Sequence, residues 1–429
     1  MNKKILIITF ILFAVFFRFF RLDYPNAYVF DEVYHGFTAK EYLKGSIEAW
    51  EWWTTPPPGV AFEWTHPPLA KEFMTASMFV VRTTDAWGWR LPGAILGLIS
   101  IFLVYKLGNL LFHNKNVGLI AAFIFSIDGL NFVQSRTGMN DIYLVTFSLA
   151  SIFFLLKKRF IISSIFLGLA LASKWAGLYL VGIDILLLIY FKEIRQIVYY
   201  TTIPILVYFL SYLPFFFLGH TFDQFIQLQQ QMWWYHSRLK ATHDYSSPAW
   251  SWPLNLFPVW YYVQYHKNTN VSNIFASGNP LLFWLGSSAV FVTIWDFITS
   301  HTTGKHHPIY SNDVRDNTNS SLWGLINTKK QSFLIILLGF FAFWLPWLFS
   351  PRIMFLYHFS PSIPFLCLAL AYQLEQLFQQ KNNRIFAIGI LVLIFISFLL
   401  VYPFITGIPM PRNIMNLFFE TNLTKNPFL

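Results

Sequence analysis

Long apolar segments follow one another along this chain, and they fix the solvent in which it folds. About 20 mostly apolar residues are needed for a helix to cross a bilayer, because hydrocarbon offers no partner to exposed backbone groups. Eleven candidate spans lie near residues 5–21, 92–112, 117–136, 140–156, 160–173, 176–191, 197–218, 280–299, 332–349, 360–378 and 385–403. The sequence therefore predicts an all-α polytopic membrane protein, with residues 1–429 forming a single membrane domain. The spans at 160–173 and 176–191 are short, so a broken or re-entrant pair there would change the count.

Basic residues in the short connections predict which ends of the spans face the cytoplasm. They recur at alternate ends: Lys3, Lys4, Lys115, Lys157, Lys158, Arg159, Lys192, Arg195, Lys329, Lys330, Lys381 and Arg384. We expect the first span to be retained, with a cytoplasmic N-terminus, because no small-residue cleavage site follows its apolar stretch. This orientation gives two large extracytoplasmic loops, 22–91 and 219–279, and a cytoplasmic loop, 300–331. The formal net charge of +10 then reflects topology, and we expect no nucleic-acid partner.

Two adjacent carboxylates, Asp31 and Glu32, follow the first span directly, at the membrane surface. Ionisable groups at this depth are candidates for function, and an ion pair with Arg18 or Arg21 is the structural alternative. Chemistry is expected in the two large loops, because function is often carried on loops held by a rigid scaffold.

Other polar residues recur on the same predicted face. In the segment 66–71, prolines stiffen the turn between His66 and Lys71. Arg136 and Asp141 either serve a site or pair with each other to brace two helices. Lys174, Arg352 and His358 interrupt apolar segments, where interfacial anchoring is the alternative to function. Together, carboxylates, cations and aromatic residues on one face suit an anionic lipid phosphate joined to a polar sugar.

Several kinds of site are not indicated by the sequence. The one cysteine, Cys367, lies in an apolar segment, so neither an internal disulfide nor a cysteine metal cluster can form. The sequence has no Walker motif, dinucleotide-binding glycine motif or zinc-ligand spacing. No Asp-x-Asp pair lies on the predicted outer face. We expect neither a cofactor nor a metal ion.

With these residues in view, the chain resembles the protein O-mannosyltransferase family of C-type glycosyltransferases, in its short prokaryotic form. The blocks that carry the resemblance are Arg18–Tyr42, His66–Lys71, Gln134–Asp141, Ser173–Leu178, Met232–Pro253, Gly278–Pro280 and Tyr357–Pro361. Two features depart from the family pattern: Tyr34 and His35 stand where the family often has His-Phe, and the spacer 46–63 aligns with no block.

The resemblance implies transfer of mannose from a polyprenyl phosphate to Ser or Thr hydroxyls of translocated proteins, with inversion. It implies an active site on the extracytoplasmic face of the cell (plasma or inner) membrane, with the bilayer and the secretion translocon as partners. A carboxylate general base typically contributes about 10²- to 10⁴-fold in rate. We assign that role to Asp31, with Glu32 as alternative or orienting partner.

A phosphate leaving group needs cations more than an acid catalyst. The candidate phosphate-binding residues are Arg136, Arg90, Lys174 and Arg352, and the candidate sugar- or acceptor-binding residues are His66, Lys71, His243, Asp141 and His358.

Three other functions stay open on the sequence alone. The first is a C-type glycosyltransferase with another lipid-linked sugar or a glycolipid acceptor. The second is a secondary transporter, which would more often show internal repeats and broken midplane helices. The third is a non-catalytic assembly partner.

Overall fold

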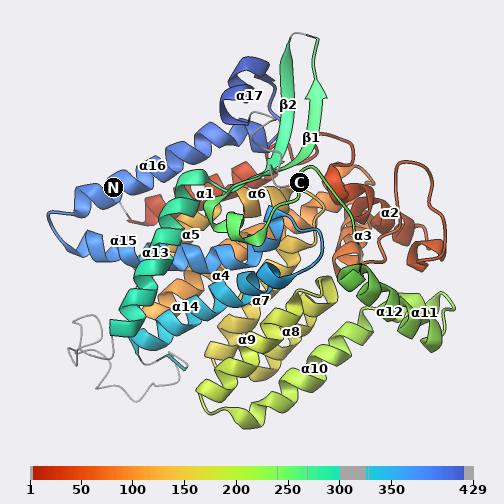
Figure 1. Cartoon of the computed structure of the whole chain (residues 1–429), viewed down its shortest axis with the longest axis horizontal. Coiled ribbons are helices and arrows are strands. Elements are labelled where there is room, and N and C mark those ends of the chain that lie inside the picture. Colours follow the sequence, from red (N-terminus) through yellow and green to blue (C-terminus); the bar gives the residue numbers. More distant parts are fainter. Residues whose placement is uncertain (1–2, 239, 268, 300–324, 327, 420–429) are drawn as a thin grey trace.

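The computed structural model of the chain describes residues 3–238, 240–267, 269–299, 325–326 and 328–419, and these form a helical body with one small sheet (Figure 1). The helices that coincide with predicted spans are α1 (Lys3–Phe19), α4 (Ala86–Phe112), α5 (Lys115–Ser126), α6 (Gly129–Arg136), α7 (Asp141–Leu156), α8 (Phe160–Ser173), α9 (Gly177–Tyr190), α10 (Ile197–Leu210), α11 (Leu213–Phe217), α13 (Pro280–Thr299), α14 (Lys329–Trp344), α15 (Ile363–Gln379) and α16 (Arg384–Val401). The predicted cytoplasmic loop 300–331 lies largely outside the described residues.

Each of the predicted apolar ranges contains a helix, but the helices differ in their capacity to span a bilayer. Within the described ranges, four stretches are long and apolar enough to cross alone: Ala86–Phe112, Pro280–Thr299, Lys329–Phe349 and Arg384–Ile405. Both α8 and α9 have 14 residues, which corresponds to about 21 Å at 1.5 Å per residue. The helical character of the fold is confirmed, while the number of crossings stays a prediction.

The predicted third span, 117–136, is broken. Helices α5 and α6 meet at an angle of 64°. The carboxylate of Asp128 accepts hydrogen bonds from the backbone N–H groups of Leu130 and Asn131 and so caps α6. A Cβ at Gly129 would lie 2.4 Å from the carbonyl oxygen of Ser277, so only glycine fits this approach. The break therefore has a local cause in sequence, and it lies at a different place from the break considered at 160–191.

The two large loops that were predicted to be extracytoplasmic pack against each other. The first contains α2 (His35–Leu43), α3 (Leu69–Val81) and the 3₁₀ helix Phe30–Val33, and the second contains α12 (Phe222–Arg238). A separate apolar cluster joins Trp50 and Phe62 of the first loop to Phe215, Leu228 and Met232 of the α11–α12 region. This packing fixes the position of the first loop above the helical body.

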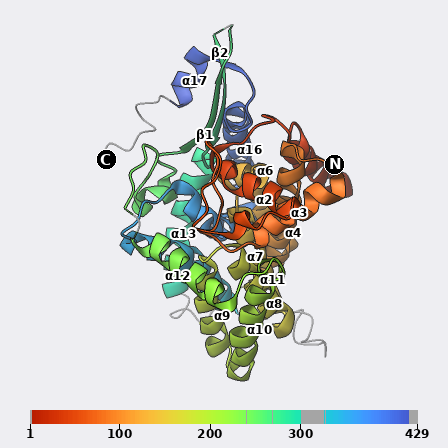
Figure 2. The same ribbon diagram turned by 90° about the vertical axis from the view of Figure 1, so that its right-hand side faces the viewer.

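A three-stranded antiparallel sheet was missed by the all-α prediction. Strands β1 (Val259–Tyr265), β2 (Asn270–Ala276) and β3 (Met410–Pro411) lie in the order β1-β2-β3, and the C-terminal helix α17 (Arg412–Phe418) follows β3. The β1–β2 hairpin projects beyond the helices in both views (Figures 1 and 2). Aromatic and β-branched residues favour strands, and β1 consists largely of them.

Candidate active site

Asp31 lies in the single 3₁₀ turn Phe30–Val33 that follows α1. The backbone of Phe30 is left-handed, with φ 49°, a conformation that costs a non-glycine residue about 1–3 kcal/mol. The Phe30 ring stacks on Tyr261 of β1, with centroids 4.3 Å apart and an interplanar angle of 7°. The aromatic stack from a distant strand thus helps to hold the strained residue that precedes Asp31.

The carboxylate of Asp31 is partly buried and has no hydrogen-bond or ion-pair partner in the part of the chain that the structure describes. Burial, reinforced by the charges of Glu63 and Asp141, outweighs the opposing charge of Lys174 and raises the pKa of Asp31 to about 7. A carboxylate with this pKa is a stronger base than an ordinary aspartate and is still substantially ionised near neutral pH. The carboxylate of Asp31 is therefore available to act as a base.

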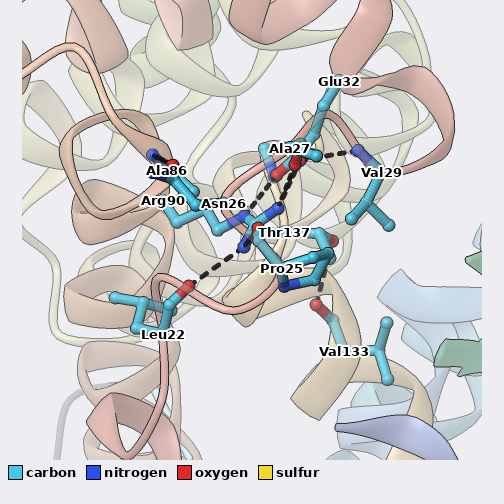
Figure 3. Close-up of polar contacts among 11 residues, drawn as sticks. Leu22, Pro25, Asn26, Ala27, Val29, Glu32, Ala86, Arg90, Val133 and Thr137 are labelled. Carbon is cyan, nitrogen blue, oxygen red and sulfur yellow. Dashed lines mark hydrogen bonds and ion pairs between the residues drawn. The ribbon is translucent and has the colours of Figure 1, made fainter. Parts of the chain in front are cut away.

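The neighbouring carboxylate, Glu32, has both oxygens hydrogen-bonded within the fold (Figure 3). Its two oxygens accept hydrogen bonds of 2.7 Å from Nε and Nη2 of Arg90. They also accept from the backbone N–H groups of Val29 and Gly138. Glu32 has no exposed surface. Of the two predicted roles for Glu32, this geometry favours the orienting partner of Asp31 and disfavours the base.

Arg90 uses all five of its N–H groups inside the protein. Three of them donate to backbone carbonyls, and these belong to Leu22, Pro25 and Ala27. Only 1% of Arg90 is exposed. This arrangement disfavours the predicted phosphate-binding role of Arg90, because no N–H donor remains for a ligand.

Arg136 is similarly occupied. Its Nη1 and Nη2 donate four hydrogen bonds of 2.7–3.2 Å to the backbone carbonyls of Phe17, Arg18, Phe20 and Arg21, at the C-terminal end of α1. It does not pair with Asp141, which was the structural alternative. Arg136 was the first candidate for binding the donor phosphate; that role stays a prediction, and in this geometry Nη1 and Nη2 brace the end of α1.

Two other predicted cations border an open pocket. Nζ of Lys174 lies 2.8 Å from Oδ1 of Asp141, and this ion pair joins the end of α8 to the start of α7. A pocket opens beside Lys174. It is lined by His66, Lys174, Trp175, Ala176, Leu178, Tyr179, His236, Trp347, Ser350, Arg352 and His358. Lys174 and Arg352 are thus brought together on one cavity, as their predicted role requires.

Imidazole rings form one wall of this pocket. Nδ1 of His236 accepts a hydrogen bond from Arg352, and its Nε2–H donates to the carbonyl oxygen of Thr65 at 2.7 Å. Burial and the charge of Arg352 lower the pKa of His236 to about 4, so the ring is neutral at pH 7. His66 stacks on His236 with ring centroids 5.0 Å apart. The neutral rings fix the direction of Arg352 without adding charge.

The remaining predicted residues lie at different distances from the pocket. His358 lines it and stacks on Trp252 and Tyr357. Lys71 is buried and donates to the carbonyls of His66 and Pro67, so it stabilises the turn from inside. His243 lies on another side of the Asp31 turn, with its ring centroid 6.2 Å from that of Phe30.

Three residues at this site were absent from the predicted set. Glu63, whose charge acts on Asp31, lies in the spacer that matches no family block. Its Oε1 accepts from the Thr65 hydroxyl and from the backbone N–H of His66. Tyr261 lies on the unpredicted strand β1, and His236 stood in a family block without an assigned role. The only sequence signal for Glu63 was its place three residues before His66.

Two family models together match most of this chain. The family model described as dolichyl-phosphate-mannose-protein mannosyltransferase matches residues 8–241. The model described as the C-terminal four TMM region of protein-O-mannosyltransferase matches residues 221–418. The polyprenol-phosphate-mannose--protein mannosyltransferase of Mycolicibacterium smegmatis is 24% identical over 442 residues, covering 82% of this chain and 80% of that protein. The protein of the same name from Mycobacterium tuberculosis is 22% identical over 444 residues, covering 82% and 79%.

Two solved structures share the fold. The protein O-mannosyltransferase Pmt1-Pmt2 complex of S. cerevisiae, bound to the sugar donor, superposes with a TM-score of 0.76 at 15% identity, covering 98% of this chain and 92% of that chain. ArnT from Cupriavidus metallidurans, bound to undecaprenyl phosphate, gives a TM-score of 0.60 at 12% identity, covering 99% and 77%.

Proposed function

This chain belongs to the protein O-mannosyltransferase family of membrane glycosyltransferases, and on that basis we propose that it transfers mannose from a polyprenyl-phosphate donor to Ser or Thr hydroxyls of proteins. The observation that carries the proposal is the combination of an unpartnered carboxylate with a raised pKa, Asp31, and a pocket that presents two cations, Lys174 and Arg352. A transferase of this kind needs a base for the acceptor and positive charge for the leaving phosphate.

The donor is assigned to the pocket. Its phosphate lies between Lys174 and Arg352, where charge-assisted hydrogen bonds are stronger than neutral ones. Leu178, Tyr179 and Trp347 line the same pocket and suit the first units of a polyprenyl chain. The mannosyl group then points toward Asp31, whose pKa responds to the charge of Lys174.

The chemical step follows from this placement. The acceptor hydroxyl oxygen forms a bond to the anomeric carbon as the bond from that carbon to the phosphate oxygen breaks. The hydroxyl proton passes to the carboxylate of Asp31, and the electron pair leaves with the lipid phosphate toward Lys174 and Arg352. Because a phosphate leaves without protonation, no second carboxylic acid is required. Attack opposite to the leaving phosphate inverts the anomeric centre.

The proposed setting is the extracytoplasmic face of the cell membrane, where exported chains that leave the secretion translocon present their hydroxyl groups. The orientation rests on the basic residues in the short loops. Another lipid-linked sugar or a glycolipid acceptor is the alternative that the same chemistry permits.

The test uses the purified protein in lipid nanodiscs with radiolabelled polyprenyl-phosphate mannose and a Ser/Thr-containing peptide. We expect mannosylated peptide from the wild type, and none above background from Asp31→Asn, with donor binding retained. Asp223→Asn makes the same chemical change on the exposed face of α12 and serves as the matched control. A wild type that binds the donor, fails on peptides and mannosylates a glycolipid would replace this proposal by the glycolipid alternative.

A further inference from the structure

Strand β1 presents an open edge. It is the outer strand of the sheet, because the order is β1-β2-β3. Exposed edges normally carry charges or proline that prevent pairing with another chain. The sequence of β1, VWYYVQY, contains neither. Among the described residues, no backbone or side-chain group is hydrogen-bonded to its outer edge.

The phase of the ladder identifies the groups on that edge. The backbone N–H of His266 donates to the carbonyl of Asn270 at 2.9 Å, which makes these two residues a hydrogen-bonded pair. In an antiparallel ladder such pairs alternate with pairs whose N–H and C=O groups point outward. Val263 and Tyr265 therefore direct their backbone groups to the open edge. Strand β2 shows the same alternation. The carbonyl of Asn273, which lies opposite Val263, points away from β1 and accepts a hydrogen bond from the backbone N–H of Gly407.

The inner end of the same strand lies at the candidate base. The register shifts between Trp260 and Tyr262, so Tyr261 is an extra residue in a bulge. Bulges re-aim side chains and are common beside active sites. The Tyr261 ring stacks on Phe30, the residue before Asp31. At about 3.3 Å per residue, Val263 lies about 7 Å along the strand from Tyr261.

We propose that the acceptor protein binds as an added β-strand on the open edge of β1, in an extended conformation that leads its Ser or Thr hydroxyl to Asp31. This inference rests on the proposed function and adds the mode of acceptor recognition. Main-chain hydrogen bonds in such a complex recognise the extended backbone, while side-chain pockets add selectivity. The projecting hairpin, exposed at Val263 and Tyr265, offers the edge to a chain arriving from water (Figure 2).

A second copy of this chain is the competing occupant, because two open edges can pair with each other. The continuity of β1 with the Asp31 turn favours the acceptor. Edge-to-edge pairing of two copies would place the partner's strand, rather than a hydroxyl-bearing substrate, beside Tyr261.

The first experiment uses wild-type protein in nanodiscs and a set of acceptor peptides, each with one backbone amide N-methylated. N-methylation removes one N–H donor at a time. We expect KM for the peptide to rise roughly five- to tenfold, the value of one net hydrogen bond, at every second position, and much less at the positions between. A uniform effect, or no effect, along the peptide overturns the proposal.

The second experiment changes the enzyme. Val263→Pro removes an outward N–H and spares the β1–β2 ladder, because proline is tolerated on edge strands where the N–H points outward. We expect it to raise KM for the peptide roughly five- to tenfold with donor affinity unchanged, and Val263→Ala to raise KM by less. An equal effect of the two variants overturns the proposal, as does a change in oligomeric state without a change in KM. Both experiments start from a wild-type enzyme that is active on peptides. A negative result in either would therefore contradict the proposed mode of acceptor binding and leave the proposed function standing.

Discussion

The guanidinium of Arg90 and the carboxylate of Glu32 form two hydrogen bonds of 2.7 Å across a fully buried interface between α4 and the turn that carries Asp31. The pair joins segments 58 residues apart in sequence. Since Glu32 is adjacent to Asp31, the pair fixes the backbone from which the candidate base projects.

Removing Arg90 is expected to destabilise the protein and to abolish transfer. Loss of one partner from a buried ion pair typically costs about 3–5 kcal/mol, because the other charge stays buried and unpaired. Thermal unfolding in detergent would show a lower Tm for Arg90→Ala, and Arg195→Ala, an exposed arginine, is the control. Adding Glu32→Gln to Arg90→Ala should recover part of the lost stability. A wild-type Tm for Arg90→Ala would contradict a bracing role for this pair.

Transfer should depend on pH through Asp31. The base acts as the carboxylate, and its pKa is raised to about 7 by burial and neighbouring carboxylates. Therefore kcat/KM should be roughly constant above pH 8 and should fall about tenfold per pH unit well below pH 7. The measurement is peptide mannosylation at fixed ionic strength between pH 5 and 9. Full activity at pH 5 would exclude Asp31 as the titrating base.

The raised pKa of Asp31 also predicts that its ionised form lowers the free energy of unfolding. Between the unfolded value, near 3.8, and the folded value, about 7, the folded state binds the proton more tightly, so stability decreases as pH rises. Above pH 7 the cost is fully present, and well below pH 3.8 it is absent. Asp31→Asn should accordingly raise Tm relative to wild type at pH 8 and raise it by much less at pH 4.5. A lower Tm for Asp31→Asn at pH 8 would show that the carboxylate stabilises the fold.

Arg352 and Arg136 should respond differently to replacement by alanine. Arg352 borders the pocket, and a hydrogen bond to a charged group is worth about 1.5–3 kcal/mol, so Arg352→Ala should weaken polyprenyl-phosphate binding about tenfold or more, with little change in Tm. Arg136→Ala should mainly lower Tm, because four carbonyls at and just after the end of α1 lose their donor. Fluorescence binding of a labelled lipid phosphate, measured beside thermal unfolding, separates the two effects. The reverse pattern would restore Arg136 as a phosphate ligand.

Hydropathy located the helices because burial in hydrocarbon constrains every residue of a span. It missed the break before α6, although Asp128 followed by Gly129 is a recognisable helix start. It also missed β1, since aromatic and β-branched residues are equally at home in a strand and in a membrane-facing segment.

The candidate site was harder to predict than the fold. Asp31, Lys174 and Arg352 were identified as charges at one face, and their positions agree with roles that remain to be tested. The hydrogen bonds of Arg90 and Arg136 disfavour their predicted phosphate-binding role. These bonds could not be predicted, because a sequence gives the charge of a guanidinium but not the direction of its N–H groups. Glu63 escaped notice because its influence on Asp31 arises only when the first loop folds.

The hydrogen bonds from Arg136 to the end of α1 also have an electrostatic consequence. The aligned peptide dipoles of a helix place about half a negative elementary charge at its C-terminus. Here that end precedes the Asp31 turn, and the guanidinium covers its last carbonyls. Arg136 thereby offsets the negative end of the macrodipole. Under the proposed function, an anionic donor that approaches the turn would therefore meet less repulsion from the helix that supports it.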